Sequence, residues 1–225
     1  MQAPTHHTEA LAALESLAKR PVMVTIDLHR GHLDPEVATL PLPAERAAPL
    51  VERCASLFNS LRGLGIPIVH VITAYRNRAE ILSNPYWRFQ SERPDSPRAR
   101  IAEHNLEGMP GLELMPGLLG EGDIVVDTKK RYDCLLGTDL EITLESLECD
   151  TVLLTGVNTN SCVIATGIAA SVRDYAVFMV EDGIDTMLGP ELHDAALSVV
   201  RASFGWAIDA ESLLARLGDQ SGSGR

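Results

Sequence analysis

The chain has few cysteines, few positive charges and no long hydrophobic run, and each shortage excludes a class of protein. Four cysteines in 225 residues, none in a CxxC spacing, are too sparse for a disulfide scaffold or a cysteine-rich metal site. The 19 Lys and Arg stand against 31 Asp and Glu, and this net charge of −12 disfavours nucleic acid and anionic membrane as partners. No apolar stretch is long enough to span a bilayer, and no secretory signal pattern is present. We therefore expect a cytoplasmic protein with reduced thiols.

What the sequence does contain is a regular alternation of short apolar runs with amphipathic stretches. Strands are expected at 22–27, 66–72, 123–127, 151–155, 176–181 and 206–208, and helices at 8–19, 44–64, 140–147, 161–174, 190–203 and 210–217. Alternating strands and helices predict a mainly parallel sheet with right-handed crossovers and helices on both faces. The expected fold is an α/β protein, a three-layer α/β/α sandwich. Residues 1–217 are expected to form one domain, and the Gly- and Ser-rich tail 218–225 to be disordered.

The turn that ends in Cys162 is typical of a nucleophile held at the start of a helix. Thr151–Thr155 forms an apolar strand, Gly156 breaks it, and a helix is expected from Ser161. A sulfur at a helix N-terminus lies near unpaired N–H groups and the positive end of the dipole, which favour its thiolate. A buried, inert cysteine is the competing interpretation.

Two further strands deliver charged side chains to the same edge. Asp27 follows the strand that begins at Pro21, and Lys129 follows the strand that begins at Asp123. In an open parallel sheet, the carboxyl edge is where ligand crevices form. A carboxylate, an ammonium and a thiol together are the parts of an activated-nucleophile site.

These three motifs make the chain resemble the isochorismatase-like cysteine hydrolases, which include N-carbamoylsarcosine amidohydrolase, biuret hydrolase and ureidoacrylate hydrolase. The resemblance covers about Pro21 to Leu217. It rests on Val-Thr-Ile-Asp27-Leu, on Lys129-Lys-Arg-Tyr132 and on Thr155-Gly-Val-Asn-Thr-Asn-Ser-Cys162-Val. The family pattern favours Lys129 over the adjacent Lys130 as the lysine of the triad.

The resemblance implies a C–N hydrolase of small amide, ureido or N-carbamoyl substrates that releases ammonia through a thioester and needs no cofactor. Asp27, Lys129 and Cys162 would form its catalytic triad. It further implies a cis peptide bond between Val157 and Asn158, so that the backbone N–H groups of Asn158 and Cys162 form an oxyanion hole. A thiol-redox enzyme, with Cys134 as a resolving cysteine, and a catalytically silent oligomeric binding protein are the alternatives.

Three residues directly after the acid allow several interpretations. His29, Arg30 and His32 could contact the substrate, stabilise the turn through hydrogen bonds, or bind a metal together with Asp27. Nicotinamidases of the resembled family hold a metal through a cluster after the second strand, and residues 70–78 lack that cluster. We therefore expect no metal.

The segment 73–122 is too long for a plain connection and is rich in Arg and Pro. It carries Tyr86, Trp87 and Phe89 close together, as either a wall over the pocket or an oligomer contact. We expect a homo-oligomer that acts on a small molecule. Trp87, Tyr132 and Asn158 are further candidates for contact with that substrate.

Overall fold

The computed structural model describes residues 5–222 and contains one six-stranded, all-parallel sheet. Its strands have the spatial order β3-β2-β1-β4-β5-β6. Their bounds are Pro21–Ile26 (β1), Ile68–Thr73 (β2), Ile124–Lys129 (β3), Thr151–Val157 (β4), Ala176–Asp185 (β5) and Trp206–Ile208 (β6). The chain builds outward from β1 to β3, returns to the centre and builds outward again from β4. The strand order therefore reverses between β1 and β4, where α/β sheets form ligand crevices.

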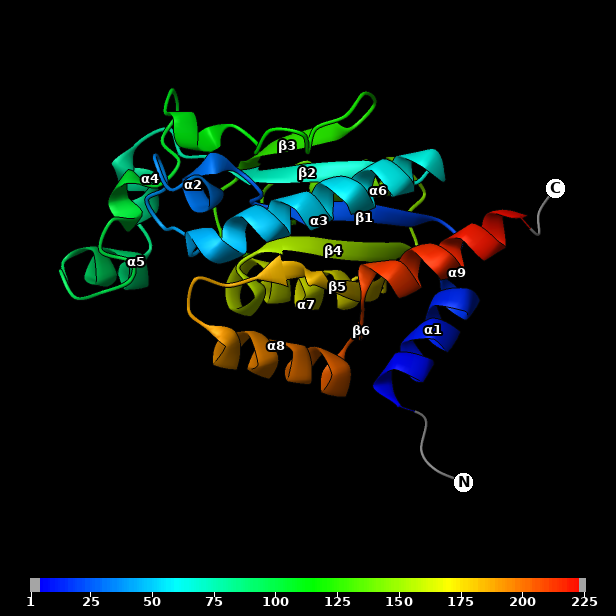
Figure 1. The fold of residues 1–225 in the computed structure, drawn as a ribbon. Coiled ribbons are helices and arrows are strands. Elements are labelled where there is room, and N and C mark those ends of the chain that lie inside the picture. The colour runs from blue at the N-terminus through cyan, green and yellow to red at the C-terminus, as the bar shows by residue number, and fades with distance from the viewer. Residues whose placement is uncertain (1–4, 223–225) are drawn as a thin grey trace.

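Helices cover both faces of the sheet, so the predicted α/β/α sandwich is confirmed (Figure 1). The helices α1 (His6–Leu17), α3 (Ala44–Gly63) and α9 (Ala210–Gly222) pack on one face. The helices α6 (Leu140–Ser146), α7 (Ile164–Ser171) and α8 (Pro190–Ser203) pack on the other. Strand β1 serves both cores, because Met23 points into the first and Val22, Val24 and Ile26 point into the second.

The long connection between β2 and β3 is folded and lies at one end of the sheet. It contains α4 (Arg78–Leu82), α5 (Pro85–Ser91) and two short 3₁₀ turns, η1 (Ile101–Glu103) and η2 (Pro110–Leu112). In Figure 1 these segments gather with α2 (Arg30–Leu33), and η2 packs against α2. Helices α1 and α9 lie toward the opposite end and pack against each other (Figure 1).

The structure extends several predicted elements. Strand β3 continues to Lys129 rather than ending at residue 127, and β5 continues to Asp185 because Ile184 and Asp185 pair with the end of β4. Helix α9 continues to Gly222, so residues 218–222 are helical rather than disordered, and 223–225 lie outside the described residues. Once a helix is nucleated, each added residue gains a hydrogen bond at little further cost, which carries it past Gly218.

Between residues 5 and 222, the chain has no helix that combines the length and the hydrophobicity needed to cross a membrane.

Candidate active site

The carboxyl ends of three strands bring the acid, the base and the thiol together. Asp27 comes directly after β1, Lys129 is the last residue of β3, and Cys162 lies in the one-turn π-helix η3 (Thr159–Val163) that leads from β4 into α7. Gly156 allows this approach, because a Cβ atom on it would lie 1.9 Å from the carbonyl oxygen of Ile26. Its φ of 114° also lies in the region that favours glycine.

Lys129 Nζ bridges the other two groups of this buried triad. It donates a hydrogen bond of 2.6 Å to Asp27 Oδ2 and lies 3.3 Å from Cys162 Sγ. It also donates to the Thr73 hydroxyl, and the Thr73 backbone N–H donates to Asp27 Oδ1 over 2.8 Å. Asp27, Lys129 and Cys162 are 0%, 1% and 6% exposed. The ammonium, carboxylate and sulfur are therefore held in one buried cluster.

The two charged residues stabilise each other's ionised forms. Burial by itself would raise the pKa of Asp27, but the Lys129 ammonium, and to a smaller extent His29, hold it well below its ordinary value. Burial by itself would lower the pKa of Lys129, but the Asp27 carboxylate keeps it well above its ordinary value. At neutral pH the pair is a carboxylate and an ammonium.

The sulfur is protonated in the resting site, contrary to the expectation of a thiolate. Burial raises the pKa of Cys162 to about 11; the Lys129 ammonium lowers it, while the Asp27 carboxylate raises it further. Burial also raises the pKa of Cys54 and that of Cys149, each to about 12. Cys162 is thus the most acidic of the three, but still a thiol at neutral pH.

The peptide bond between Val157 and Asn158 is cis, as the family resemblance implies. The Asn158 side chain is held at the pocket wall, where its Oδ1 accepts a hydrogen bond of 2.8 Å from the Met187 backbone N–H. This bond ties the turn after β4 to the segment after β5.

A pocket opens onto the triad and receives residues from four parts of the chain. Of the predicted substrate contacts, His32, Trp87, Tyr132 and Asn158 line it, and His29 and Arg30 do not. Arg30 instead forms ion pairs with Asp34 and Glu113, over 2.7 and 2.8 Å. The pocket has a volume of about 20 Å³, roughly the room that one water molecule needs. Side chains of the wall must therefore move to admit a substrate.

The aromatic wall comes from the segment between β2 and β3. Trp87 is 3% exposed, and its indole Nε1 donates a hydrogen bond of 3.0 Å to the Tyr132 hydroxyl. Its ring lies edge-on to Tyr75 and Tyr132. Tyr86 and Phe89, in contrast, are 56% and 57% exposed. The aromatic cluster is thus divided between the pocket and the surface.

Three histidines form a buried cluster beside Asp27. His29, His32 and His104 each offer a nitrogen within 4.8 Å of the others, the one set of potential metal ligands of this kind among the described residues. Their contacts also fit a structural role: His32 Nδ1 bonds the Leu40 carbonyl oxygen over 2.7 Å, and His104 Nδ1 bonds the Thr39 hydroxyl over 2.8 Å. Burial lowers the pKa of His32 to about 3 and that of His104 well below its ordinary value, so both rings are neutral at neutral pH.

Lys129 and Lys130 point to different surroundings. Lys130 donates to the Ala74 carbonyl oxygen, lies 3.9 Å from a carboxylate oxygen of Glu80, and has a side chain that is 31% exposed. Lys129 faces Asp27 and Cys162. The strand register that favours Lys129 as the inward-facing lysine is therefore the observed one.

Several polar residues of the pocket are absent from the predicted substrate contacts. Thr73, Arg98, His104 and Ser161 all line the pocket. Thr73 could have been identified as the last residue of a strand beside Asp27, and Ser161 from its place before the cysteine. Arg98 and His104 come from irregular chain, where no periodicity tells which side chains point inward.

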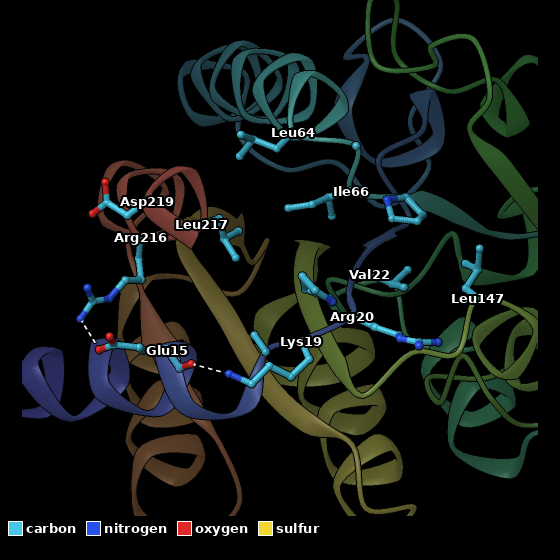
Figure 2. Close-up of a pocket in the computed structure, with 14 residues that line it drawn as sticks. Glu15, Lys19, Arg20, Val22, Leu64, Ile66, Leu147, Arg216, Leu217 and Asp219 are labelled. Carbon is cyan, nitrogen blue, oxygen red and sulfur yellow. Dashed lines mark hydrogen bonds and ion pairs between the residues drawn. The ribbon is translucent and has the colours of Figure 1, made fainter. Parts of the chain in front are cut away.

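A larger cavity, of about 870 Å³, lies at the opposite end of the sheet (Figure 2). It is lined by residues that precede the strands, among them Arg20, Pro67 and Leu147, and by α1 and α9. Figure 2 shows Glu15 of α1 paired with Arg216 of α9 at its rim, where Arg216 Nη2 lies 2.6 Å from Glu15 Oε2. None of its lining residues belongs to the triad. Size alone therefore does not identify the reactive site.

Comparison with known proteins gives matches over most of the chain. The family model described as the isochorismatase domain matches residues 21–212. The ureidoacrylate amidohydrolase of Methylobacterium radiotolerans is 30% identical over 177 residues, covering 76% of this chain and 68% of that protein. The maleamate amidohydrolase of Pseudomonas putida is 22% identical, covering 88% and 87%. The crystal structure of a cysteine hydrolase from Pseudomonas syringae pv. phaseolicola superposes with a TM-score of 0.74 at 18% identity, covering 90% of this chain and 97% of that one.

Proposed function

Because the chain belongs to the isochorismatase family and is a hydrolase, we propose that it is a cysteine-dependent amidohydrolase that cleaves a C–N bond of a small amide, ureido or N-carbamoyl substrate. The observation that carries the proposal is the bridging position of Lys129 Nζ, 2.6 Å from the Asp27 carboxylate and 3.3 Å from the Cys162 sulfur. The names of the two curated relatives, a ureidoacrylate and a maleamate amidohydrolase, support this reaction class.

In the proposed first half-reaction, the Cys162 sulfur attacks the carbonyl carbon of the substrate. Its pKa of about 11 and the low pKa of Asp27 make a free thiolate beside protonated Asp27 unfavourable. We therefore expect the thiol proton to pass to Asp27 as the S–C bond forms, with Lys129 compensating the negative charge that moves between them. The C–N bond then breaks, and the leaving nitrogen takes the proton from Asp27 and departs as ammonia.

In the second half-reaction, water hydrolyses the thioester. Asp27 accepts a proton from that water as its oxygen bonds to the carbonyl carbon. The S–C bond then breaks, and Asp27 returns the proton to the departing sulfur, which gives the acid and the Cys162 thiol. In both steps an oxyanion develops on the carbonyl oxygen. The backbone N–H groups of Asn158 and Cys162 are the proposed donors to it.

An ammonia-release screen across small amides, ureas and N-carbamoyl acids tests the proposal. We expect at least one compound to release ammonia with wild-type protein and none to do so with Cys162→Ala, while Cys134→Ser remains active because no resolving cysteine is needed. Ammonia release that survives Cys162→Ala would refute the mechanism. Turnover that requires Cys134 and a thiol reductant would favour redox chemistry.

A further inference from the structure

The charge balance of the pocket is opposite to that of the whole protein. The chain carries a net charge of −12. The pocket lining, however, contains three cations, Arg98, Lys129 and Arg131, against one carboxylate, that of Asp27. The neutral rings of His32 and His104 add no charge at neutral pH. Since Lys129 is paired with Asp27, two guanidinium groups are left in excess.

The two arginines differ in how their N–H groups are used. Arg131 donates to the Lys130 carbonyl oxygen over 2.6 Å and to the Ser83 hydroxyl over 2.9 Å, and it stacks 5.1 Å from the Trp87 ring centre. The Arg98 guanidinium contacts the Tyr132 ring, with its Cζ 5.9 Å from the ring centre. Among residues 5–219, no side-chain or backbone oxygen accepts a hydrogen bond from the Arg98 guanidinium, and no carboxylate forms an ion pair with it.

This isolation is energetically unusual, because Arg98 is only 6% exposed. A buried charge without a hydrogen-bonding partner costs free energy, and such groups in proteins are normally paired. Even the neighbouring arginines at the surface have carboxylate partners. Arg93 pairs with Asp95 over 2.8 Å, and Arg100 pairs with Glu103 over 3.4 Å. Arg98 lines the pocket, and among the described residues its guanidinium donors have no acceptor.

We propose that Arg98 binds a carboxylate of the substrate, so that the compound cleaved at Cys162 is a small amide acid rather than a neutral amide. A guanidinium presents two parallel N–H donors that match the two oxygens of a carboxylate. The inference rests on the proposed amidohydrolase function and deepens it. Lys129 is occupied by Asp27, which leaves Arg98 as the anion contact, while Arg131 adds positive potential without a free donor fork.

The experiment separates binding from turnover by using Cys162→Ala protein, which cannot form the thioester. Matched pairs that differ only in the second group, malonamate and malonamide, succinamate and succinamide, and maleamate and its diamide, are titrated at millimolar concentrations by calorimetry and thermal shift. At least one acid is expected to bind about tenfold or more tightly than its diamide, in keeping with a bidentate charged hydrogen bond.

Arginine variants test which residue causes the preference for the acid. In the Cys162→Ala background, Arg98→Met should abolish the preference for the acid, Arg98→Lys should recover part of it, and Arg100→Met, two residues away and ion-paired at the surface, should leave it unchanged. Circular dichroism of each variant checks that it is folded. If Arg98→Met is not folded, Arg98→Lys still provides the test.

Several results would overturn the inference. These are equal binding of acid and diamide in every pair, no binding by any of them, a preference that is undiminished in both Arg98→Met and Arg98→Lys, or equal binding of inorganic phosphate at the same site. Failure of the amidohydrolase proposal is distinguishable: the acids would then bind through Arg98, but wild-type protein would release no ammonia from any of them.

Discussion

At the scale of single residues, the site depends on a buried ion pair whose members cannot be removed independently. Asp27 and Lys129 are both buried, so deleting one leaves the other charge without its partner inside the protein. Breaking a buried pair in this way costs about 3–5 kcal/mol, whereas removing both charges can be nearly neutral. The sequence places both residues at strand ends, where solvated side chains are common, and therefore does not predict this cost.

We expect Asp27→Asn and Lys129→Met each to abolish turnover and to lower the free energy of unfolding, each by roughly 3 kcal/mol. The double variant should be inactive but more stable than the Lys129→Met or Asp27→Asn single variant, because no unpaired charge remains. Urea unfolding of the four proteins measures this double-mutant cycle. Lys130→Ala is the control and should leave both activity and stability close to wild type. Additive losses in the double variant would contradict the coupling.

The raised pKa of Cys162 predicts how its reactivity depends on pH. Because burial holds the sulfur as a thiol up to about pH 11, its rate of alkylation by iodoacetamide should rise about tenfold per pH unit from pH 7 to 10, without a plateau. It should also exceed the rates at Cys54 and Cys149, whose pKa values are about 12. Peptide mass spectrometry after timed labelling measures all three. A plateau near neutral pH would show that Lys129 already holds a thiolate.

At the scale of elements, the segment between β2 and β3 supplies the wall that covers the triad. Of the three neighbouring aromatic residues Tyr86, Trp87 and Phe89, Trp87 is the buried one. Its indole N–H donates a hydrogen bond to the Tyr132 hydroxyl. The small volume of the pocket means that this wall must shift when substrate enters. The segment is therefore expected to act in substrate binding within its own chain.

Trp87→Ala should destabilise the protein by about 3 kcal/mol and raise KM more than it lowers kcat, because it removes packing and enlarges the pocket without touching the triad. Trp87→Phe keeps most of the ring but loses the donor to Tyr132, and it should have a smaller effect on both. Steady-state kinetics on a hydrolysed substrate and thermal unfolding provide the measurements. Unchanged KM in Trp87→Ala would exclude the wall role.

The sequence predicts these elements unequally, for physical reasons. The helix Pro190–Ser203 and the strand Trp206–Ile208 have the predicted bounds, because their apolar residues and the flanking Pro and Gly residues are local signals. The ends of β3 and β5 are set by pairing with neighbouring strands, which the local pattern does not reveal. The pocket contacts of Arg98 and His104 depend on the path of irregular chain, so no local rule identifies them.

At the scale of the whole molecule, an exposed pair of aromatic side chains is the candidate contact surface of the expected homo-oligomer. Tyr86 and Phe89 are more than half exposed on α5, beside Arg88 and Arg93, and these residue types are enriched in interface cores. The buried position of Trp87 shows that this residue is engaged within its own chain. Any contact between subunits through α5 would therefore use Tyr86 and Phe89.

We expect light scattering at micromolar concentration to give a mass of two or more chains, and Tyr86→Ser/Phe89→Ser to reduce it to that of one chain. Trp87→Ala should keep the assembled mass, because its side chain faces the pocket rather than the surface. A single-chain mass for the wild-type protein would contradict the expectation, whatever the variants do.

The central claim is that Cys162 becomes covalently acylated during amide hydrolysis, and acid-quenched mass spectrometry during turnover tests it most directly. With a compound that releases ammonia, we predict an adduct on the peptide containing Cys162 whose added mass is that of the substrate minus ammonia, and no adduct in Cys162→Ala. Steady ammonia release with an unmodified Cys162 peptide, unaffected by Cys162→Ala, would contradict the account.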